Sequence, residues 1–296
     1  FYKKEFNIMS QDLSAALYKA YTPLLDEAYK LASLSAKLDT ASELVKYTQG
    51  SREVVVPKMT LQGLADYDRA SGYVGGEASM TLETLTMNYE RGRMFSIDSM
   101  DNEETAGVAY GRLAGEFLRS YVVPEIDAVR FATYAALAGT HPNDANINAA
   151  GWYALVSAAQ VAMTEAEVPE SDRHLFITAT GHADILNKGL TDSKVFFDNF
   201  ASVTVVPQSR FYEAVTLTAS GAGGYARTTG ANNINFLIVH KPSVIQVLKH
   251  QDAKIISPQQ NQAADAWKFG YRVYGLNDAY DNKVKGIYVH TSAVTS

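Results

Sequence analysis

The sequence predicts a protein of the α+β class, in which a two-stranded β-arm, one long helix and a compact mixed domain follow one another. Strand-forming residues dominate 53–59 and 80–98, whereas apolar residues recur at helical spacing from Val108 to Leu137. After residue 143, short strand patterns alternate with short helical ones. The 296 residues are enough for one large domain or two ordinary ones.

The first predicted element is helical. From Leu13 to Leu38, apolar residues recur three and four positions apart. Pro23 interrupts this run, because proline donates no backbone hydrogen bond and clashes with the preceding turn. We therefore expect two short helices. They form either a pair packed on their own domain or an arm that reaches a neighbouring subunit.

The next region predicts a β-arm. Glu53 to Met59 is rich in β-branched residues, and Pro57 favours an edge strand because it cannot donate to a ladder. A second strand pattern covers Met80 to Asp98, with a break expected at Arg91–Arg93. Because an isolated two-stranded arm is marginal in water, this arm needs a surface to lie on, which indicates a partner subunit. A hairpin folded back on its own domain is the alternative.

The polar connection from Gln62 to Ser79 is the predicted tip of this arm. Its glycines permit bending and its carboxylates keep it soluble, so we expect it to be mobile in the free subunit and ordered on a neighbour. The residues predicted to make the inter-subunit contact are Leu61, Tyr67, Arg69, Tyr73, Gly75, Gly76 and Leu82.

A long helix is predicted next. Asp101, Glu103 and Glu104 suit a first turn, where carboxylates interact favourably with the helix dipole. The apolar stripe continues to Gly139, a suitable C-cap, and Pro124 is expected to kink the helix rather than end it. At about 1.5 Å per residue such a helix spans roughly 50 Å, enough to brace a whole domain.

The C-terminal half reads as a mixed domain followed by a tail. The expected helices are Ala149–Glu165, Gly181–Asn187, Pro242–Lys249 and one in the segment after Lys254; the expected strands are His174–Thr178, Val203–Val206, Val215–Leu217, Ile234–His240 and those before His290.

The sequence offers no group of residues that predicts catalysis, cofactor binding or metal binding. It contains no phosphate-binding loop, no GxSxG elbow and no HExxH; Gly221–Gly224 is expected to be a mobile loop, and His174 and His182 fall on different elements. There is no cysteine, and a net charge of −6 gives no reason to expect sequence-specific nucleic-acid binding. An α/β hydrolase or a carbohydrate-binding enzyme with a tyrosine platform is a remote alternative.

Two segments resemble a known family. KIISPQQNQAADAWKFGYRVYGLNDAYDNKVKGIYVH, from Lys254 to His290, resembles the C-terminal part of tailed-bacteriophage major capsid proteins of the Hong Kong 97 type. VVPEIDAVRFATYAALAG, from Val122 to Gly139, resembles the spine helix of that family. The resemblance implies an N-terminal arm (1–50), an extended β-arm or E-loop (51–100), a spine helix of a peripheral domain (101–140), an axial α/β domain (141–253) and return strands of the peripheral domain (254–296).

The resemblance also implies a function. The chain is expected to be a major capsid protein that self-assembles into hexamers and pentamers, forming the icosahedral head around a phage double-stranded DNA genome. It would act without a cofactor, in the virion after assembly in the host cytoplasm, with scaffold, portal and decoration proteins as candidate partners and no membrane contact. An encapsulin-like compartment is the alternative with the same fold.

One chemistry of this family can be tested on the sequence. Some members join their subunits by an isopeptide bond between a lysine on the extended loop and an asparagine on a neighbour. No lysine occurs between Lys58 and Lys188, so the tip of the arm cannot supply the amine and only Lys58, near its base, remains. The resemblance therefore implies a shell that is held together without covalent bonds.

Overall fold

The computed structural model describes residues 33–40, 53–70, 72–100, 115–143, 151–187 and 190–293. Most of the helical pattern predicted over Leu13–Leu38 lies outside these residues, as do the predicted first-turn carboxylates at 101–104. From the N-terminal region the structure shows residues 33–40, which include the short 3-10 helix η1 (Ala36–Leu38).

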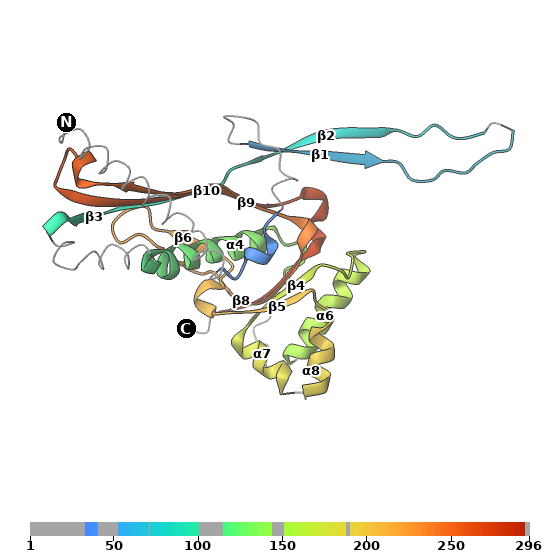
Figure 1. Cartoon of the computed structure of the whole chain (residues 1–296). Helices are drawn as coiled ribbons and strands as arrows, with labels where there is room; N and C mark the ends of the chain where they lie inside the picture. Colours follow the sequence, from blue (N-terminus) through green and yellow to red (C-terminus); the bar gives the residue numbers. More distant parts are fainter. Residues whose placement is uncertain are drawn as a thin grey trace.

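The β-arm projects away from the rest of the molecule (Figure 1). Strands β1 (Glu53–Leu61) and β2 (Ala78–Thr86) pair antiparallel, from Glu53 opposite Thr86 to Leu61 opposite Ala78. Pro57 lies in the middle of β1, whose one strand partner in the described part of the chain is β2. This confirms the strand predicted at Glu53–Met59 and the edge position of Pro57. The second predicted run, Met80–Asp98, is only partly right, because β2 ends at Thr86 and residues 89–98 form a strand of another sheet.

A three-stranded antiparallel sheet carries the arm. Its order is β3 (Tyr89–Asp98), β10 (Ala266–Ala279) and β9 (Val244–Ile256). The break predicted at Arg91–Arg93 is wrong, because β3 runs through it with Gly92 opposite Arg272. A Cβ at Gly92 would lie 3.1 Å from the carbonyl oxygen of Tyr271, so glycine suits this close pairing of strands.

The predicted long helix packs beside this sheet. Residues 115–137 are continuously helical, with a π-helical turn, η3 (Leu118–Val122), followed by α4 (Val123–Leu137). The helix continues through Pro124 as predicted. The wider π turn directly before this residue accommodates the proline ring and the missing hydrogen bond.

Helix α4 contacts two hydrophobic cores. One end packs with the aromatic side chains of the three-stranded sheet, for example Ile126 with Phe269. The other end packs Phe131 and Tyr134 against a second sheet, in a cluster that includes Phe176. The helix therefore packs against both sheets.

The second sheet has four strands in the order β11 (Ile287–Ser292), β8 (Asn233–His240), β4 (Arg173–Thr178) and β5 (Ser202–Val206), with β4 and β5 parallel. Helices α6 (Trp152–Glu165), α7 (Ala179–Leu186) and α8 (Leu190–Phe197) form a second core with this sheet. A small hairpin, β6 (Val215–Leu217) and β7 (Tyr225–Arg227), completes the described part. All of these elements except α8 and β7 were predicted in type.

Two predicted helices are wrong. The first, Pro242–Lys249, is only the 3-10 turn η5 (Lys241–Ser243) before β9, whose Val244, Ile245 and Val247 are buried. These side chains suit a strand, and β9 pairs with β10 along its length.

The second wrong helix is the one expected after Lys254. Here β9 continues to Ile256, and the 3-10 turns η6 (Pro258–Gln260) and η7 (Asp281–Gly286) precede β10 and β11. The side chain of Asn261 donates to the carbonyl of Ala266 at 3.0 Å and holds the chain in a turn that leads into β10.

Candidate assembly surface

The arm displays apolar side chains to solvent along both strands and the connection between them. Leu64 is fully exposed, and the other members of this set are each more than half exposed: Met59, Leu61, Tyr67, Tyr73, Val74, Met80 and Leu82. Grouped exposed apolar side chains are typical of a surface that contacts another molecule. We refer to residues 59–82 as the arm tip.

The predicted contact residues all lie exposed on the arm tip. Leu61, Tyr67, Tyr73 and Leu82 have exposed fractions of 65, 59, 92 and 67%, and Arg69, Gly75 and Gly76 are also exposed. Their position on the arm is therefore as expected, and their contact with a neighbour stays a prediction.

The structure brings only two of these contact residues together. The rings of Tyr67 and Tyr73 meet edge to face with centroids 4.9 Å apart. Next to them Asp68 and Gly72 exchange backbone hydrogen bonds of 3.3 and 2.7 Å, and Gly72 has a φ of +81°, which glycine adopts without strain. Leu61 and Leu82 are apart in the register, because their partners are Ala78 and Pro57.

Sequence reasoning missed the other exposed apolar side chains of the arm tip. Leu64 and Val74 lie in the polar connection, and Met59 and Met80 face each other across the strands. The available signal was their position: they are apolar residues in an arm too thin to have a core of its own.

The base of the arm, in contrast, belongs to the body. Val54, Leu85 and Met87 are buried in one cluster with Ile245 and Leu276. The hairpin therefore does not fold back onto its own domain. It is fixed at its base by a hydrophobic core and projects beyond it.

A charged contact also ties the arm base to the body. Lys58 Nζ lies 3.7 Å from Asp281 Oδ2, and the backbone N–H of Asp281 donates to Glu83 Oε1 at 3.4 Å. The amine that the sequence left as the one candidate for cross-linking is thus paired within its own chain.

The glycine-rich segment after β6 is held against β3 by two arginines. Arg93 donates to the carbonyl oxygens of Ala222 and Gly221 at 2.9 and 2.7 Å, and Arg91 donates to that of Gly224 at 3.3 Å. Arg91 also pairs with Glu125 at 2.8 Å, and this hydrogen bond raises the pKa of the guanidinium. The carbonyl groups of this segment face the arginines, so it is not arranged as a phosphate-binding loop.

The titratable groups of the described residues form no cluster suited to a metal ion. Among these residues no three His, Cys, Asp or Glu side chains are placed to hold a metal ion. His174 Nδ1 lies 2.7 Å from Ser202 Oγ, and its pKa is lowered mainly by burial. His182 instead stacks on Phe197, so the two histidines do not converge. In the described part of the chain, no helix has the length and hydropathy needed to cross a membrane.

Comparison with solved structures identifies the fold. A chain from the mature capsid of bacteriophage PhiM1 matches with a TM-score of 0.59 at 9% identity, covering 83% of each chain. The capsid structure of cyanophage P-SCSP1u matches with a TM-score of 0.53 at 12% identity, covering 83% of this chain and 85% of the other. A virus-like particle from Pyrococcus furiosus matches with a TM-score of 0.55 at 12% identity, covering 90% of this chain and 95% of the other.

No protein-family model and no curated protein sequence matches this chain. The structural matches cover most of the chain and agree with one another, so the chain has the Hong Kong 97-type fold of phage capsid proteins. This confirms the fold class that the sequence predicted.

Proposed function

We propose that this chain is a major capsid protein that self-assembles into hexamers and pentamers and forms an icosahedral head around a phage DNA genome. The observation that carries the proposal is the arm tip, an exposed apolar surface projecting from a body with the capsid fold. A side chain such as Leu64, fully exposed in the single chain, gains burial only against another molecule.

In this proposal the N-terminal arm is 1–50, the extended β-arm 51–100 and the spine helix 101–140. The axial domain is 141–253, and the return strands of the peripheral domain are 254–296. The helices α6, α7 and α8 then belong to the axial domain, and β10 belongs to the return strands of the peripheral domain. Each arm tip lies on a neighbouring copy, which makes every subunit both donor and acceptor, as a closed shell needs.

The test is the assembly state of the purified chain. Particles, rings or tubes seen by negative-stain microscopy support the proposal. The control is the double variant Leu64→Ser with Tyr73→Ser, which makes the arm tip more polar and should stay folded but form none of these assemblies. An α/β hydrolase or carbohydrate-binding enzyme would instead give a small oligomer in both forms.

An encapsulin-like compartment is the second candidate, favoured by the match to the Pyrococcus furiosus virus-like particle. Both candidates use the same shell and differ in its contents. Nuclease-protected DNA inside particles from phage-producing cells supports the head, whereas a single co-purifying protein and no DNA supports the compartment. Scaffold, portal and decoration proteins are candidate partners of the head only.

A further inference from the structure

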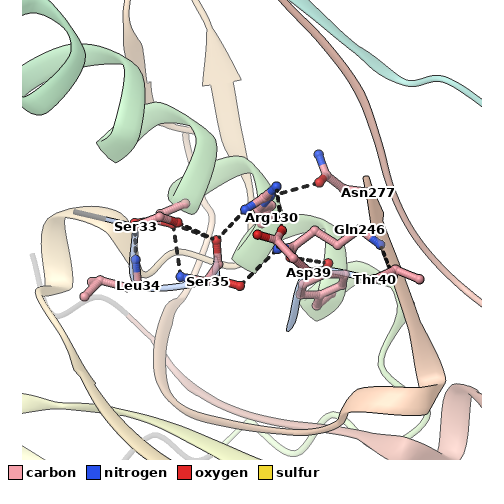
Figure 2. Close-up of polar contacts among 10 residues, drawn as sticks. Ser33, Leu34, Ser35, Asp39, Thr40, Arg130, Gln246 and Asn277 are labelled. Atoms are coloured by element: carbon pink, nitrogen blue, oxygen red, sulfur yellow. Dashed lines mark hydrogen bonds and ion pairs between the residues drawn. The ribbon is translucent and has the colours of Figure 1, made fainter. Parts of the chain in front are cut away.

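Residues Ser33–Thr40 form a short strap that lies across helix α4 and strand β9 (Figure 2). The strap belongs to no sheet. One backbone hydrogen bond joins it to a strand, from the N–H of Thr40 to the carbonyl of Gln246 at 3.0 Å. The strap must therefore be held mainly by its own side chains and by side chains of the body that hydrogen-bond to its backbone. We call these side chains of the body the receiving groups.

The first receiving group is Asp127 on α4, which is fully buried. Its Oδ1 accepts from Ser35 Oγ at 2.7 Å, from the N–H of Ser35 at 3.2 Å and from Ser33 Oγ at 2.9 Å. Its Oδ2 accepts from the N–H of Leu34 at 3.0 Å, and Arg210 of the body lies 3.4 Å away. The strap thus supplies most of the hydrogen bonds that a buried carboxylate needs.

The second receiving group is Arg130, one helical turn further along α4 and also fully buried. It donates to Ser35 Oγ at 2.9 Å and to Asn277 Oδ1 at 3.1 Å. Its Nη2 makes no hydrogen bond to a described residue and faces Asp39 Oδ1 of the strap at 3.4 Å. The Ser35 hydroxyl therefore bridges two buried charges of opposite sign, and Asp39 supplies the counter-charge of Arg130.

Gln246 on β9 is the third receiving group. Its amide donates to the carbonyl of Ser35 at 3.0 Å and to Asp39 Oδ1 at 2.5 Å, while its Oε1 accepts from Tyr134 at 2.8 Å. Its backbone N–H donates to Thr40 Oγ1 at 3.0 Å. The apolar part of the attachment is Leu38, which is fully buried in one cluster with Phe131 and Phe176, and Leu34, which is half-buried against that cluster.

We propose that the strap is a releasable latch, and that the polar side chains of α4 and β9 beneath it form a recognition site for residues 33–40. The polar contacts of the strap are mostly hydrogen bonds to Asp127, Arg130 and Gln246. Water can form hydrogen bonds with these three groups once the strap has left. Release breaks no strand ladder, so the strap can open while both sheets stay folded. The inference holds whether or not the chain builds a shell.

Limited proteolysis of the full chain tests the latch. Lys37 is exposed, but the next residue, Leu38, is fully buried, so trypsin cleaves the Lys37–Leu38 bond only when the strap opens. Ser35→Ala removes the bridge between Asp127 and Arg130. We expect cleavage after Lys37 to become at least about tenfold faster, as loss of hydrogen bonds to charged groups implies, with no comparable change after Arg173 in the central strand β4.

Three further variants control the experiment. Lys37→Arg keeps a trypsin site and should leave the rate unchanged. Ser33→Ala removes one donor to Asp127 and spares Arg130, so it should have a smaller effect than Ser35→Ala. Asp39→Asn alters a half-exposed side chain and should also speed cleavage after Lys37. If Ser35→Ala fails to fold, the cleavage rate of Asp39→Asn tests the latch in its place.

Two results would overturn the latch. If Ser35→Ala and Asp39→Asn speed cleavage after Lys37 and after Arg173 by the same factor, the strap opens only when the whole chain unfolds. If neither variant changes cleavage after Lys37, this polar network does not hold the strap.

Discussion

Two leucines of strand β2 offer a matched test of the division between arm base and arm tip. Leu85 is 7% exposed and packs with Val54 and Met87, whereas Leu82 is 67% exposed. Leu85→Ala should lower the free energy of unfolding by about 2–4 kcal/mol, because a buried leucine loses its transfer energy and leaves a cavity. Leu82→Ala should change it by less than about 0.5 kcal/mol, as expected for a surface position.

Leu82→Ala, which should leave the subunit stable, should weaken assembly. A leucine buried between subunits contributes about 1.5–3 kcal/mol, so Leu82→Ala should raise the protein concentration needed for assembly roughly tenfold or more. Urea titration of unassembled subunits measures the first quantity, and sedimentation of assembled protein over a concentration series measures the second. Equal destabilisation of the subunit by both variants would refute the division. So would normal assembly of Leu82→Ala.

The remaining predictions concern the arm tip, cross-linking and pH. Replacing Leu61–Thr81 by a short Gly-Ser turn should leave the subunit folded, with circular dichroism and a melt close to wild type, and abolish closed shells; an unfolded variant, or one that still forms shells, contradicts this. Boiling particles in detergent should release one band at 32.3 kDa, because the arm tip contains no lysine, and a ladder of multimers would overturn this prediction. Burial lowers the pKa of His174 and His240 below 6.5, so the unfolded chain binds protons first as the pH falls. The free energy of unfolding should therefore fall below about pH 6.5, and it should fall less in His174→Gln. Urea midpoints at pH 7.5 and 5.0 measure this loss. An equal loss in both proteins would argue against a role for His174.

The arm could be predicted because β-branched alternation, Pro57 and a polar connection are local signals. The difference between Leu82 and Leu85 could not, because both are leucines in one strand and only the packing of β9 and β10 beneath one of them separates them. Pro242 suits a helix start, so the local pattern after it predicts a helix, but the pairing of β9 with the following strand β10 decides for a strand.

The burial of Asp127 and Arg130 could not be predicted from the sequence either. Asp127 and Arg130 are three residues apart on a helix, a spacing typical of a solvent-exposed charge pair. In the structure both are fully buried, because residues 33–40, more than eighty positions earlier, lie over them. Such a contact depends on the tertiary fold and leaves no local pattern.

The central claim is that this chain builds a shell, and negative-stain microscopy of the purified protein tests it most directly. At concentrations on the order of tens of micromolar, the account predicts rings, tubes or closed particles. The exposed apolar arm tip then becomes buried between copies. A stable monomer over the same concentrations, across a range of salt and pH, would contradict it.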